Sequence, residues 1–362
     1  MSLTAEQIQK LETLALTLVD QSRARPIVLP QQNASGFWFG GGNMIESFEG
    51  DLYLVGRYRN FGDSRTGLGA GERGLELAIF KSEDRGDSFE KLISWNKHDL
   101  DIAGQPVLSI EGSALSWTEQ GVQLFVSTEK DHVGYPPGFE DYLKPGTGVW
   151  SIDRLVAADF PSLKNAVIEP NWASDHPNYL HVKDPFLYQP SNGELTLFCC
   201  THPFNWSSSN TAFRDPSGHP VYDFFPRGTA WDVAMTRGTA LLDVPMLGTF
   251  ADIDVTLMFY DGGECVRNLQ QHKSGVQRAR GYSCEELGGL AYFVDGDASE
   301  IQRISLVAPL FVSPYGTGCS RYVDVLPTST GMFTTWQQSQ SDGSQPLVMN
   351  FVPQAEIEEI LG

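Results

Sequence analysis

The sequence has few basic residues and no long hydrophobic run. Among its 362 residues, 25 lysines and arginines stand against 45 aspartates and glutamates, which gives a net charge of −20. A chain this acidic repels phosphate backbones and anionic lipids, so we expect neither nucleic acid nor membranes as partners. No stretch approaches the roughly 20 apolar residues that cross a bilayer. These absences leave a small molecule as the expected partner.

Cysteine is also scarce. The five cysteines are an odd number, and none forms a CxxC pair. No secretory signal is evident in the sequence, and this pattern favours reduced, buried thiols and a cytoplasmic location.

Several common motifs are missing. The chain has no GxGxxG before a helix, no GxxxxGK[ST], no HExxH and no GxSxG. These absences argue against dinucleotide and P-loop sites, zinc proteases and α/β-hydrolases. The seven histidines show no metal-ligand spacing, so no cofactor or metal is expected.

What the sequence does contain is a repeat. A unit of about seventy residues, rich in strand-forming residues and turn glycines, occurs five times. The copies begin near Asn43, Glu111, Asp184, Asp254 and Ser320. Repetition of an all-strand unit is typical of a β-propeller, in which the innermost strand of every blade faces a central channel. We therefore predict an all-β, five-bladed propeller over residues 35–352. Carboxylates and carbonyls in such a channel could hold a structural Ca²⁺.

Three of the repeats open on a carboxylate. In Asp184-Pro185 the proline fixes the backbone and aims the preceding side chain, and in Glu111-Gly112 the glycine allows close approach. Asp254 shares a strand face with Asp252. Singly, each has an ordinary structural explanation, such as a turn cap or a solvated loop residue. Together they would converge on one cavity, where neighbouring carboxylates have pKa values driven apart, as glycoside hydrolysis requires.

These features resemble the five-bladed β-propeller glycosidases of the arabinanase, β-xylosidase and β-fructosidase type. In the arabinanase branch, the resemblance implies an aspartate base from blade one, a pKa-tuning aspartate from blade three and a glutamate acid from blade four. Asp184 takes the blade-three position and Asp254 the blade-four position.

The sequence departs from that pattern in two places. Asn43 or, further along, Glu46 stands where blade one should supply an aspartate, and blade four offers aspartate in place of glutamate. Glu111, or Glu285 and Glu286, could supply the missing group. Which carboxylate is the acid and which the base stays open.

A second resemblance concerns residues 82–89, SEDRGDSF, which fit the Asp-box pattern SxDxGxSF of sialidase-like propellers. That box is a structural turn between outer strands. Sialidases also use three arginines and a tyrosine nucleophile. Arg57, Arg59, Arg73 and Arg321, the last followed by Tyr322, could form such a cluster, or they could simply pair with acids.

Aromatic and polar residues suggest walls for a sugar pocket. Tryptophan rings stack on the C–H faces of sugars, and Trp38 and the loop residue Trp206 are the candidates, whereas Trp117 and Trp231 fit core packing. The predicted substrate-binding residues are Trp38, Asn43, Arg59, His202, Trp206, Glu285 and Arg321.

The two ends lie outside the repeat. Residues 4–21 place apolar side chains at helical spacing, with Thr4 as N-cap and Gln7 three residues on. We expect residues 1–34 to form a helix and lead-in, and residues 353–362 a short closing helix. The first helix either packs beneath the propeller or docks onto a second subunit as a homodimer.

The sequence therefore predicts an exo-acting glycoside hydrolase for a small glycan, with Asp184, Glu111 and Asp254 at the channel mouth. The alternatives are a non-catalytic glycan-binding or interaction propeller, and a sialidase-like enzyme or lyase that acts on an acidic sugar.

Overall fold

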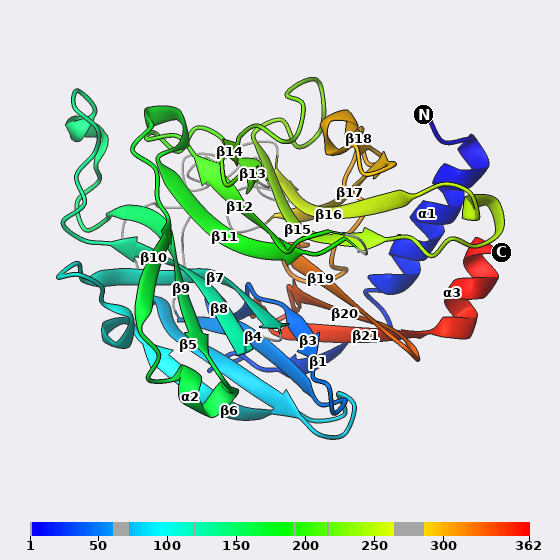
Figure 1. Ribbon diagram of the computed structural model, residues 1–362, viewed down its shortest axis with the longest axis horizontal. Coiled ribbons are helices and arrows are strands. Elements are labelled where there is room, and N and C mark those ends of the chain that lie inside the picture. The colour runs from blue at the N-terminus through cyan, green and yellow to red at the C-terminus, as the bar shows by residue number, and fades with distance from the viewer. Residues whose placement is uncertain (1, 61–71, 119–120, 191–192, 216, 264–285) are drawn as a thin grey trace.

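The computed structural model contains five antiparallel sheets arranged as the blades of a propeller (Figure 1). It describes residues 2–60, 72–118, 121–190, 193–215, 217–263 and 286–362. Four sheets have four strands, and the fifth has an additional short strand at its inner edge. The predicted all-β, five-bladed propeller with a helix near each end of the chain is confirmed.

Each blade runs from an innermost strand at the axis to an outer strand. The strands are, in blade one, β2 (Trp38–Gly40) with β3 (Met44–Glu46), β4 (Leu52–Asn60), β5 (Glu72–Ser82) and β6 (Glu90–Asn96); in blade two, β7 (Val107–Thr118), β8 (Gly121–Lys130), β9 (Val149–Ala157) and β10 (Ile168–Trp172); in blade three, β11 (His181–Tyr188), β12 (Thr196–His202), β13 (Asn210–Arg214) and β14 (Pro220–Val221); in blade four, β15 (Met235–Asp243), β16 (Val255–Gly263), β17 (Leu287–Val294) and β18 (Gln302–Arg303); and in blade five, β19 (Ser320–Thr328), β20 (Gly331–Gln338), β21 (Leu347–Pro353) and β1 (Arg25–Val28).

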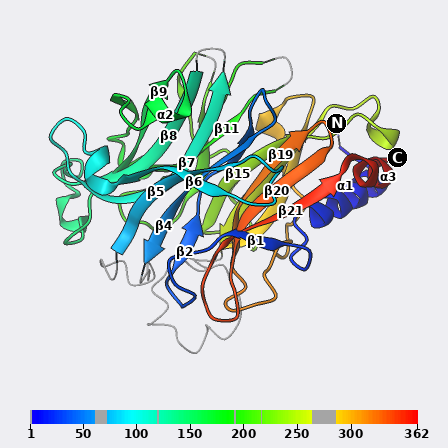
Figure 2. The same cartoon turned by 90° about the horizontal axis from the view of Figure 1, so that it is seen from below.

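The chain closes on itself in blade five. Strand β1, from the N-terminal part of the sequence, pairs antiparallel with β21, and Arg25 lies opposite Met349. Figure 2 shows β1 beside β21 at the edge of this sheet. The segment expected as a lead-in, residues 1–34, thus supplies one strand of the propeller. This pairing links the two ends of the chain within one blade.

The inner edge of blade one is interrupted. Strands β2 and β3 both pair with β4, and residues 41–43 lie between them. A Cβ atom on Gly42 would lie 2.0 Å from the carbonyl oxygen of Val55, so only glycine fits there. The break lets the carbonyl of Gly41 accept a hydrogen bond from the amide of Ser113 in blade two.

The other four innermost strands are bulged. Their registers shift between Ile110 and Ser113, Lys183 and Phe186, Gly238 and Ala240, and Arg321 and Asp324. Two bulge residues have left-handed backbone, with φ of 53° at Asp184 and 54° at Tyr322. A bulge turns a side chain out of the regular alternation of a strand. These bulges position the polar side chains described below.

The turn from β5 to β6 contains the SEDRGDSF sequence. The Asp84 carboxylate accepts hydrogen bonds from the hydroxyls of Ser82 and Ser88 and from the amide of Ser88, and the Gly86 amide donates to Ser82. These bonds lower the pKa of Asp84 to about 2. The turn is therefore held by its own side chains, in the position between outer strands that the sequence indicated. Its likeness to the sialidase-type box stays a resemblance.

The helix α1 (Ala5–Leu18) begins with the predicted capping box, in which Thr4 accepts from the Gln7 amide and the Gln7 side chain accepts from the Thr4 amide. Its apolar stripe packs against β20, β21 and the closing helix α3 (Gln354–Leu361). We call this apolar cluster the terminal-helix core; its most deeply buried members include Leu11, Leu14, Leu18, Phe250 and Trp336.

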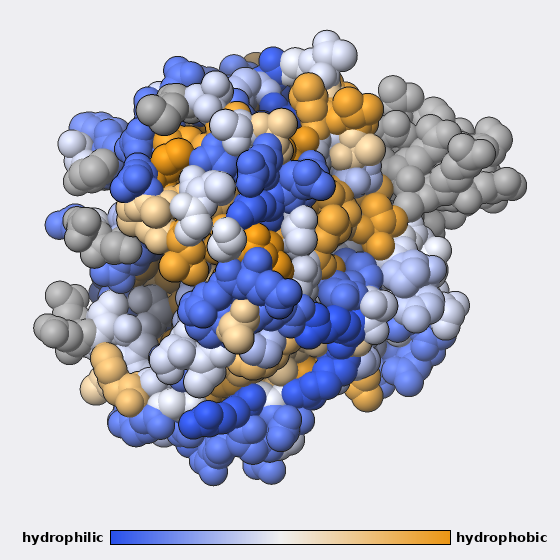
Figure 3. Space-filling view, turned by 90° about the vertical axis from the view of Figure 1, so that its right-hand side faces the viewer, coloured by the Kyte–Doolittle hydropathy of each residue, from blue (hydrophilic) through white to orange (hydrophobic). Residues whose placement is uncertain are grey.

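The apolar stripe of α1 is buried within its own chain, which is the first of the two expected arrangements, and a homodimer stays a prediction. Figure 3 shows the face that carries both terminal helices, where hydrophobic residues form separate patches among hydrophilic ones. Within the described ranges, no helix is both long and apolar enough to cross a membrane. Cys199, Cys200 and Cys319 are buried.

Candidate active site

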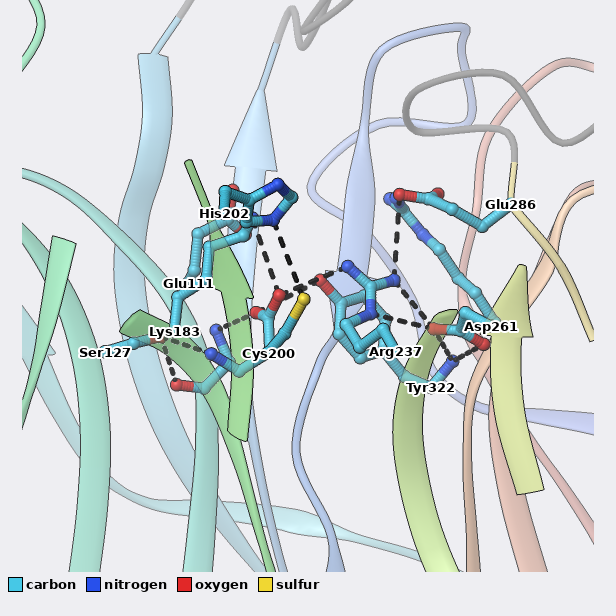
Figure 4. Close-up of polar contacts among 12 residues, drawn as sticks. Glu111, Ser127, Lys183, Cys200, His202, Arg237, Asp261, Glu286 and Tyr322 are labelled. Atoms are coloured by element: carbon cyan, nitrogen blue, oxygen red, sulfur yellow. Dashed lines mark hydrogen bonds and ion pairs between the residues drawn. The ribbon is translucent and has the colours of Figure 1, made fainter. Parts of the chain in front are cut away.

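Charged side chains from all five blades meet near the axis, where the inner strands begin. We call this group the ionic cluster. It consists of Arg57, Arg59, Glu111, Lys183, Asp184, Arg237, Asp261, Glu286, Arg321 and Tyr322. Figure 4 shows two parts of it: Glu111 and Lys183 lie on one side, Asp261 and Glu286 on the other, and Arg237 lies between them.

Glu111 forms the link between blades one and two. Its Oε2 accepts hydrogen bonds from Nε of Arg57 at 2.9 Å and Nη2 of Arg57 at 2.6 Å, and Oε1 lies 3.6 Å from Nη1 of Arg59. Burial opposes ionisation of Glu111, but Arg57, Lys183 and Arg59 outweigh it and hold its pKa well below the usual range. Glu111 is therefore a buried, ionised carboxylate at neutral pH.

Asp184 stands at the head of β11 in blade three. Its Oδ1 accepts from the Gly112 amide at 3.1 Å and from the Tyr322 hydroxyl at 3.4 Å. Its Oδ2 accepts from Nη1 of Arg237 at 3.2 Å and lies 3.4 Å from Nζ of Lys183. A Cβ atom on residue 112 would lie 2.7 Å from Asp184, so Gly112 is required for this approach. Asp184 thus connects blades two, four and five.

Arg237 bridges three carboxylates. Its Nε and Nη2 donate to Oδ2 of Asp261 at 3.1 and 2.6 Å, and Nη2 lies 3.6 Å from Oε1 of Glu286, in addition to the bond to Asp184. Burial raises the pKa of Asp261 to about 6, although Arg237 opposes the rise. Burial also acts against ionisation of Glu286, but Arg321 and Arg237 lower its pKa. The two acids of blade four therefore differ in proton affinity.

Aromatic rings separate the arginines. Tyr322 lies beneath the guanidinium carbons of Arg237 at 4.1 Å, Arg321 at 5.3 Å and Arg57 at 5.7 Å. Burial raises the pKa of the Tyr322 hydroxyl well above its usual range. The ring of Trp38 lies 4.8 Å from the guanidinium carbon of Arg59 and 5.0 Å from that of Arg321. Through cation–π contacts, these two rings thus connect arginines of blades one, four and five.

Two histidines and a tryptophan lie beside Lys183. Trp206, half-buried with φ of 57°, stacks on His181 with ring centres 4.0 Å apart and lies 4.7 Å from His202. The ammonium of Lys183 lies over Trp150 and Trp206. Burial, and then Lys183, lower the pKa of His181 to about 3. The predicted residues His202 and Trp206 therefore lie beside the ionic cluster.

The cluster adjoins a pocket on the axis. Its lining comes from the inner strands of all five blades: Gly41, Gly42, Asn43, Gly112, Ser113, Asp184, Pro185, Phe186, Gly238, Thr239 and Tyr322. Asn43 binds the backbone of Leu115 through both amide atoms, at 2.7 and 3.0 Å. The residue that stands in the position of an expected blade-one aspartate therefore ties blade one to blade two.

The structure thus brings together most of the residues singled out from the sequence. Trp38, Arg59, Glu111, Asp184 and Arg321 belong to or contact the ionic cluster, as does Glu286. Glu285 and Arg73 lie outside the residues or side chains that the structure describes.

Asp254 is the exception, and its expected position is wrong. The innermost strand of blade four is β15, so Asp254 precedes the second strand, β16. Its side chain is exposed. Arg237 pairs with Asp261, whereas Asp243 pairs with Thr256, so Asp254 lies at the far end of the sheet from the cluster. The repeats are not evenly spaced, and a regular period led to the wrong strand.

The charged residues of the ionic cluster that sequence reasoning missed are Lys183, Arg237 and Asp261. Arg237-Gly238 at the head of β15 has the same charged-residue–glycine pattern as Glu111-Gly112 at a bulge of β7. Asp261 ends a mostly apolar run, Val255 to Tyr260, which is an unusual place for a carboxylate. Arg237 and Asp261 lay inside the expected repeats, but neither stood at the head of one, where the candidates were sought.

Metal binding finds no support in the described part of the chain, which holds no group of three or more His, Cys, Asp or Glu side chains suited to an ion. The carboxylates of the ionic cluster face arginines and a lysine instead. A structural Ca²⁺ therefore stays a prediction.

Neither a sequence family nor a curated protein matches this chain. Its structure, however, is similar to solved glycoside hydrolases. A thermostable family-43 glycoside hydrolase is 11% identical with a TM-score of 0.55, over 90% of this chain and 92% of that one. An α-L-arabinofuranosidase from Lactobacillus brevis is 10% identical with a TM-score of 0.57, over 91% and 93%.

An α-L-arabinofuranosidase from Fusarium graminearum, solved with an iminosugar inhibitor, is 11% identical with a TM-score of 0.51, over 92% of this chain and 98% of that one. At such identities the likeness concerns the fold. The expected resemblance is confirmed at that level: this chain has a five-bladed β-propeller of the kind found among glycoside hydrolases.

Proposed function

We propose that this protein is a glycoside hydrolase that removes terminal sugars from a small glycan. The observation that carries the proposal is the convergence of Glu111, Asp184 and the blade-four acids Asp261 and Glu286 in one buried cluster on the propeller axis. Glycoside hydrolysis uses two carboxyl groups in different protonation states. Similar solved structures carry that activity in their names.

The electrostatics support a division of roles. Glu111 is held ionised by two arginines, so it suits the base or nucleophile. Asp261 has a pKa of about 6, so it holds a proton in weakly acidic solution. Asp184 is linked to Asp261 through Arg237 and lines the axial pocket. Groups whose environments drive their pKa values apart are the expected acid and base of a hydrolase.

Burial supports exo action. Asp184 is 4% exposed and Glu111 8% exposed, and Asp184 lines the axial pocket. Only the end of a sugar chain reaches such a position, whereas an internal linkage needs an open groove.

The test is a panel of nitrophenyl glycosides, furanosides included, with the purified protein. On any substrate that is cleaved, we expect Asp184→Asn and Glu111→Gln to lower kcat by about 10²–10⁴-fold, as removal of an acid, base or nucleophile does. The matched control is Asp254→Asn, which changes an exposed aspartate at the far end of blade four and should leave kcat unchanged.

Circular dichroism and melting temperature establish that each variant is folded. If folded Asp184→Asn and Glu111→Gln keep full turnover, the proposed catalytic site is wrong. If no glycoside is cleaved but glycans bind with affinity that the two variants retain, the protein is a non-catalytic binding propeller.

A further inference from the structure

The ionic cluster is rich in cations for so acidic a protein. In the described ranges it contains Arg57, Arg59, Lys183, Arg237 and Arg321, against four carboxylates. The chain as a whole carries −20. The cations come from blades one, three, four and five, so they gather from separate parts of the sequence. The ionic cluster therefore holds more cations than carboxylates, in a chain where carboxylates are nearly twice as frequent as cations.

Neighbouring groups respond to this positive field. Burial first, then Lys183, lower the pKa of His181, and the same two causes, followed by His181 and Arg237, lower the pKa of His202 far below its usual range. Both histidines are neutral at pH 7 and add no charge. Glu111 is held ionised by the same lysine together with two arginines. An anion entering the site would meet the same field.

One polar group beside the arginines has no partner among the residues that the structure describes. Trp38 is 5% exposed, its ring lies against Arg59 and Arg321, and its indole N–H forms no hydrogen bond with any described residue. A buried donor without an acceptor costs free energy unless a ligand supplies one. An indole N–H next to two guanidinium groups is suited to an acceptor that carries negative charge.

We infer that the sugar held at this site carries a carboxylate, which binds between Arg59 and Arg321 and accepts the Trp38 N–H. Guanidinium groups match the planar, two-oxygen geometry of a carboxylate, and the described part of the cluster holds five cations against four carboxylates. Uronic acids and sialic acids are sugars of this chemistry. The cleavage of such a sugar rests on the proposed function, but its binding does not.

Binding is tested by calorimetry at pH 7 with matched pairs of free sugars: D-glucuronate against D-glucose, D-galacturonate against D-galactose, and N-acetylneuraminate against its methyl ester. We expect at least one acid to bind and its neutral counterpart to bind at least tenfold more weakly. The affinity for the acid should fall between 50 and 500 mM salt, because added ions screen the attraction. Equal binding within each pair, or no binding of any acid, would overturn the inference.

Removing Arg59 or Arg321 would leave a buried carboxylate short of a partner and could unfold the protein. Trp38→Phe is milder, since it keeps an aromatic ring against the arginines and removes only the N–H. It should weaken binding of the acid about tenfold, with the melting temperature little changed. Arg154→Gln, which removes an exposed cation paired with Glu169 on blade two, is the control and should have no effect. Unchanged affinity in Trp38→Phe would contradict the proposed geometry.

Cleavage separates this inference from the proposed function. Nitrophenyl β-D-glucuronide and β-D-glucoside, and the corresponding galacturonide and galactoside, differ only in the carboxylate. Turnover of the neutral member at an equal rate would support the proposed hydrolase and contradict the proposed specificity for acidic sugars. If the acid binds in a way that depends on Trp38 but no glycoside is cleaved, the proposed specificity is supported and the proposed hydrolase is contradicted.

Discussion

Two regions of this propeller are equally well buried but have opposite chemistry. In the terminal-helix core, Leu14 and Trp336 are 0% exposed among aliphatic and aromatic side chains. In the ionic cluster, Arg57 and Arg321 are 1% exposed among carboxylates. The two regions are buried to a similar extent, so burial alone does not distinguish the part of the molecule that maintains the fold from the part that is proposed to perform chemistry.

The energetics of burial do distinguish them. Apolar surface removed from water stabilises by about 25 cal/mol per Å². Buried ion pairs lose their hydration, and apolar replacements of the same size are often neutral or stabilising. If the axis served stability alone, we would expect apolar side chains there, as in the terminal-helix core. The ionic cluster therefore indicates a functional requirement, and the predictions below test this contrast.

The largest loss of stability is expected for Arg237→Met. It leaves Asp184, Asp261 and Glu286 without the guanidinium that bridges them, and removing one partner of a buried ionic network costs about 3–5 kcal/mol. Urea unfolding measures the free energy. Arg154→Met breaks an exposed pair with Glu169 and should cost no more than about 1 kcal/mol. Equal, small losses of unfolding free energy in the two variants would mean that the ionic cluster is solvated and does not differ from surface ion pairs.

Leu14→Ala should lose nearly as much unfolding free energy as Arg237→Met, but it should not lose activity. The side chain is fully buried between α1 and the last blade, and such truncations cost about 2–5 kcal/mol. The folded variant should keep its kcat, because Leu14 belongs to the terminal-helix core and not to the ionic cluster. Leu16→Ala, on the exposed side of the same helix, is the control and should change the unfolding free energy far less. Loss of kcat in folded Leu14→Ala would show that the two regions are coupled.

Much of this arrangement could be predicted from the chain. The repeat of strand-forming residues and turn glycines predicted five blades, and the pairs Glu111-Gly112 and Asp184-Pro185 marked two carboxylates expected at the axis, which the structure places at bulges. The helical spacing and capping box located α1. These signals are local: each depends on residues within one turn or one strand.

The failures concern which strand lies innermost. Asp254 and Asp261 are seven residues apart on or beside one strand, and only the pairing of β15 with β16 decides which faces the cluster. Strand pairing depends on contacts between distant residues, which a repeat period approximates poorly when loops differ in length. For the same reason Arg237, on a strand that the expected boundaries placed elsewhere, was not recognised as the centre of the network.

The pH dependence of stability provides a smaller effect. The pKa of His181 is about 3 in the folded state and about 6.5 when unfolded, so its contribution is complete above pH 6.5 and is lost as pH falls from 6.5 toward 3. At pH 5 the loss is about 2 kcal/mol. Asp261 and Asp324, with pKa values raised by burial to about 6 and about 7, act in the opposite direction.

The contribution of His181 is therefore measured as a difference between proteins. His181→Gln should show less destabilisation than the parent chain when both are taken from pH 7 to pH 5 in urea unfolding. His219→Gln, at a largely exposed histidine, should follow the parent. Parallel curves for His181→Gln and the parent would mean that His181 is accessible to protons in the folded state.

The smallest effect is expected for Thr4→Ala, at the start of the helix that covers the terminal-helix core. The Thr4 hydroxyl accepts from the Gln7 amide, and loss of an N-cap costs about 1 kcal/mol. Thr13→Ala, in the exposed part of the same helix, controls for loss of a hydroxyl without loss of a cap. Because α1 lies far from the ionic cluster in sequence and belongs to the other buried region, kcat and the affinity for an acidic sugar should not change. A change in kcat or in the affinity would show that the helix cap affects the ionic cluster, and it would contradict separate roles for the two buried regions.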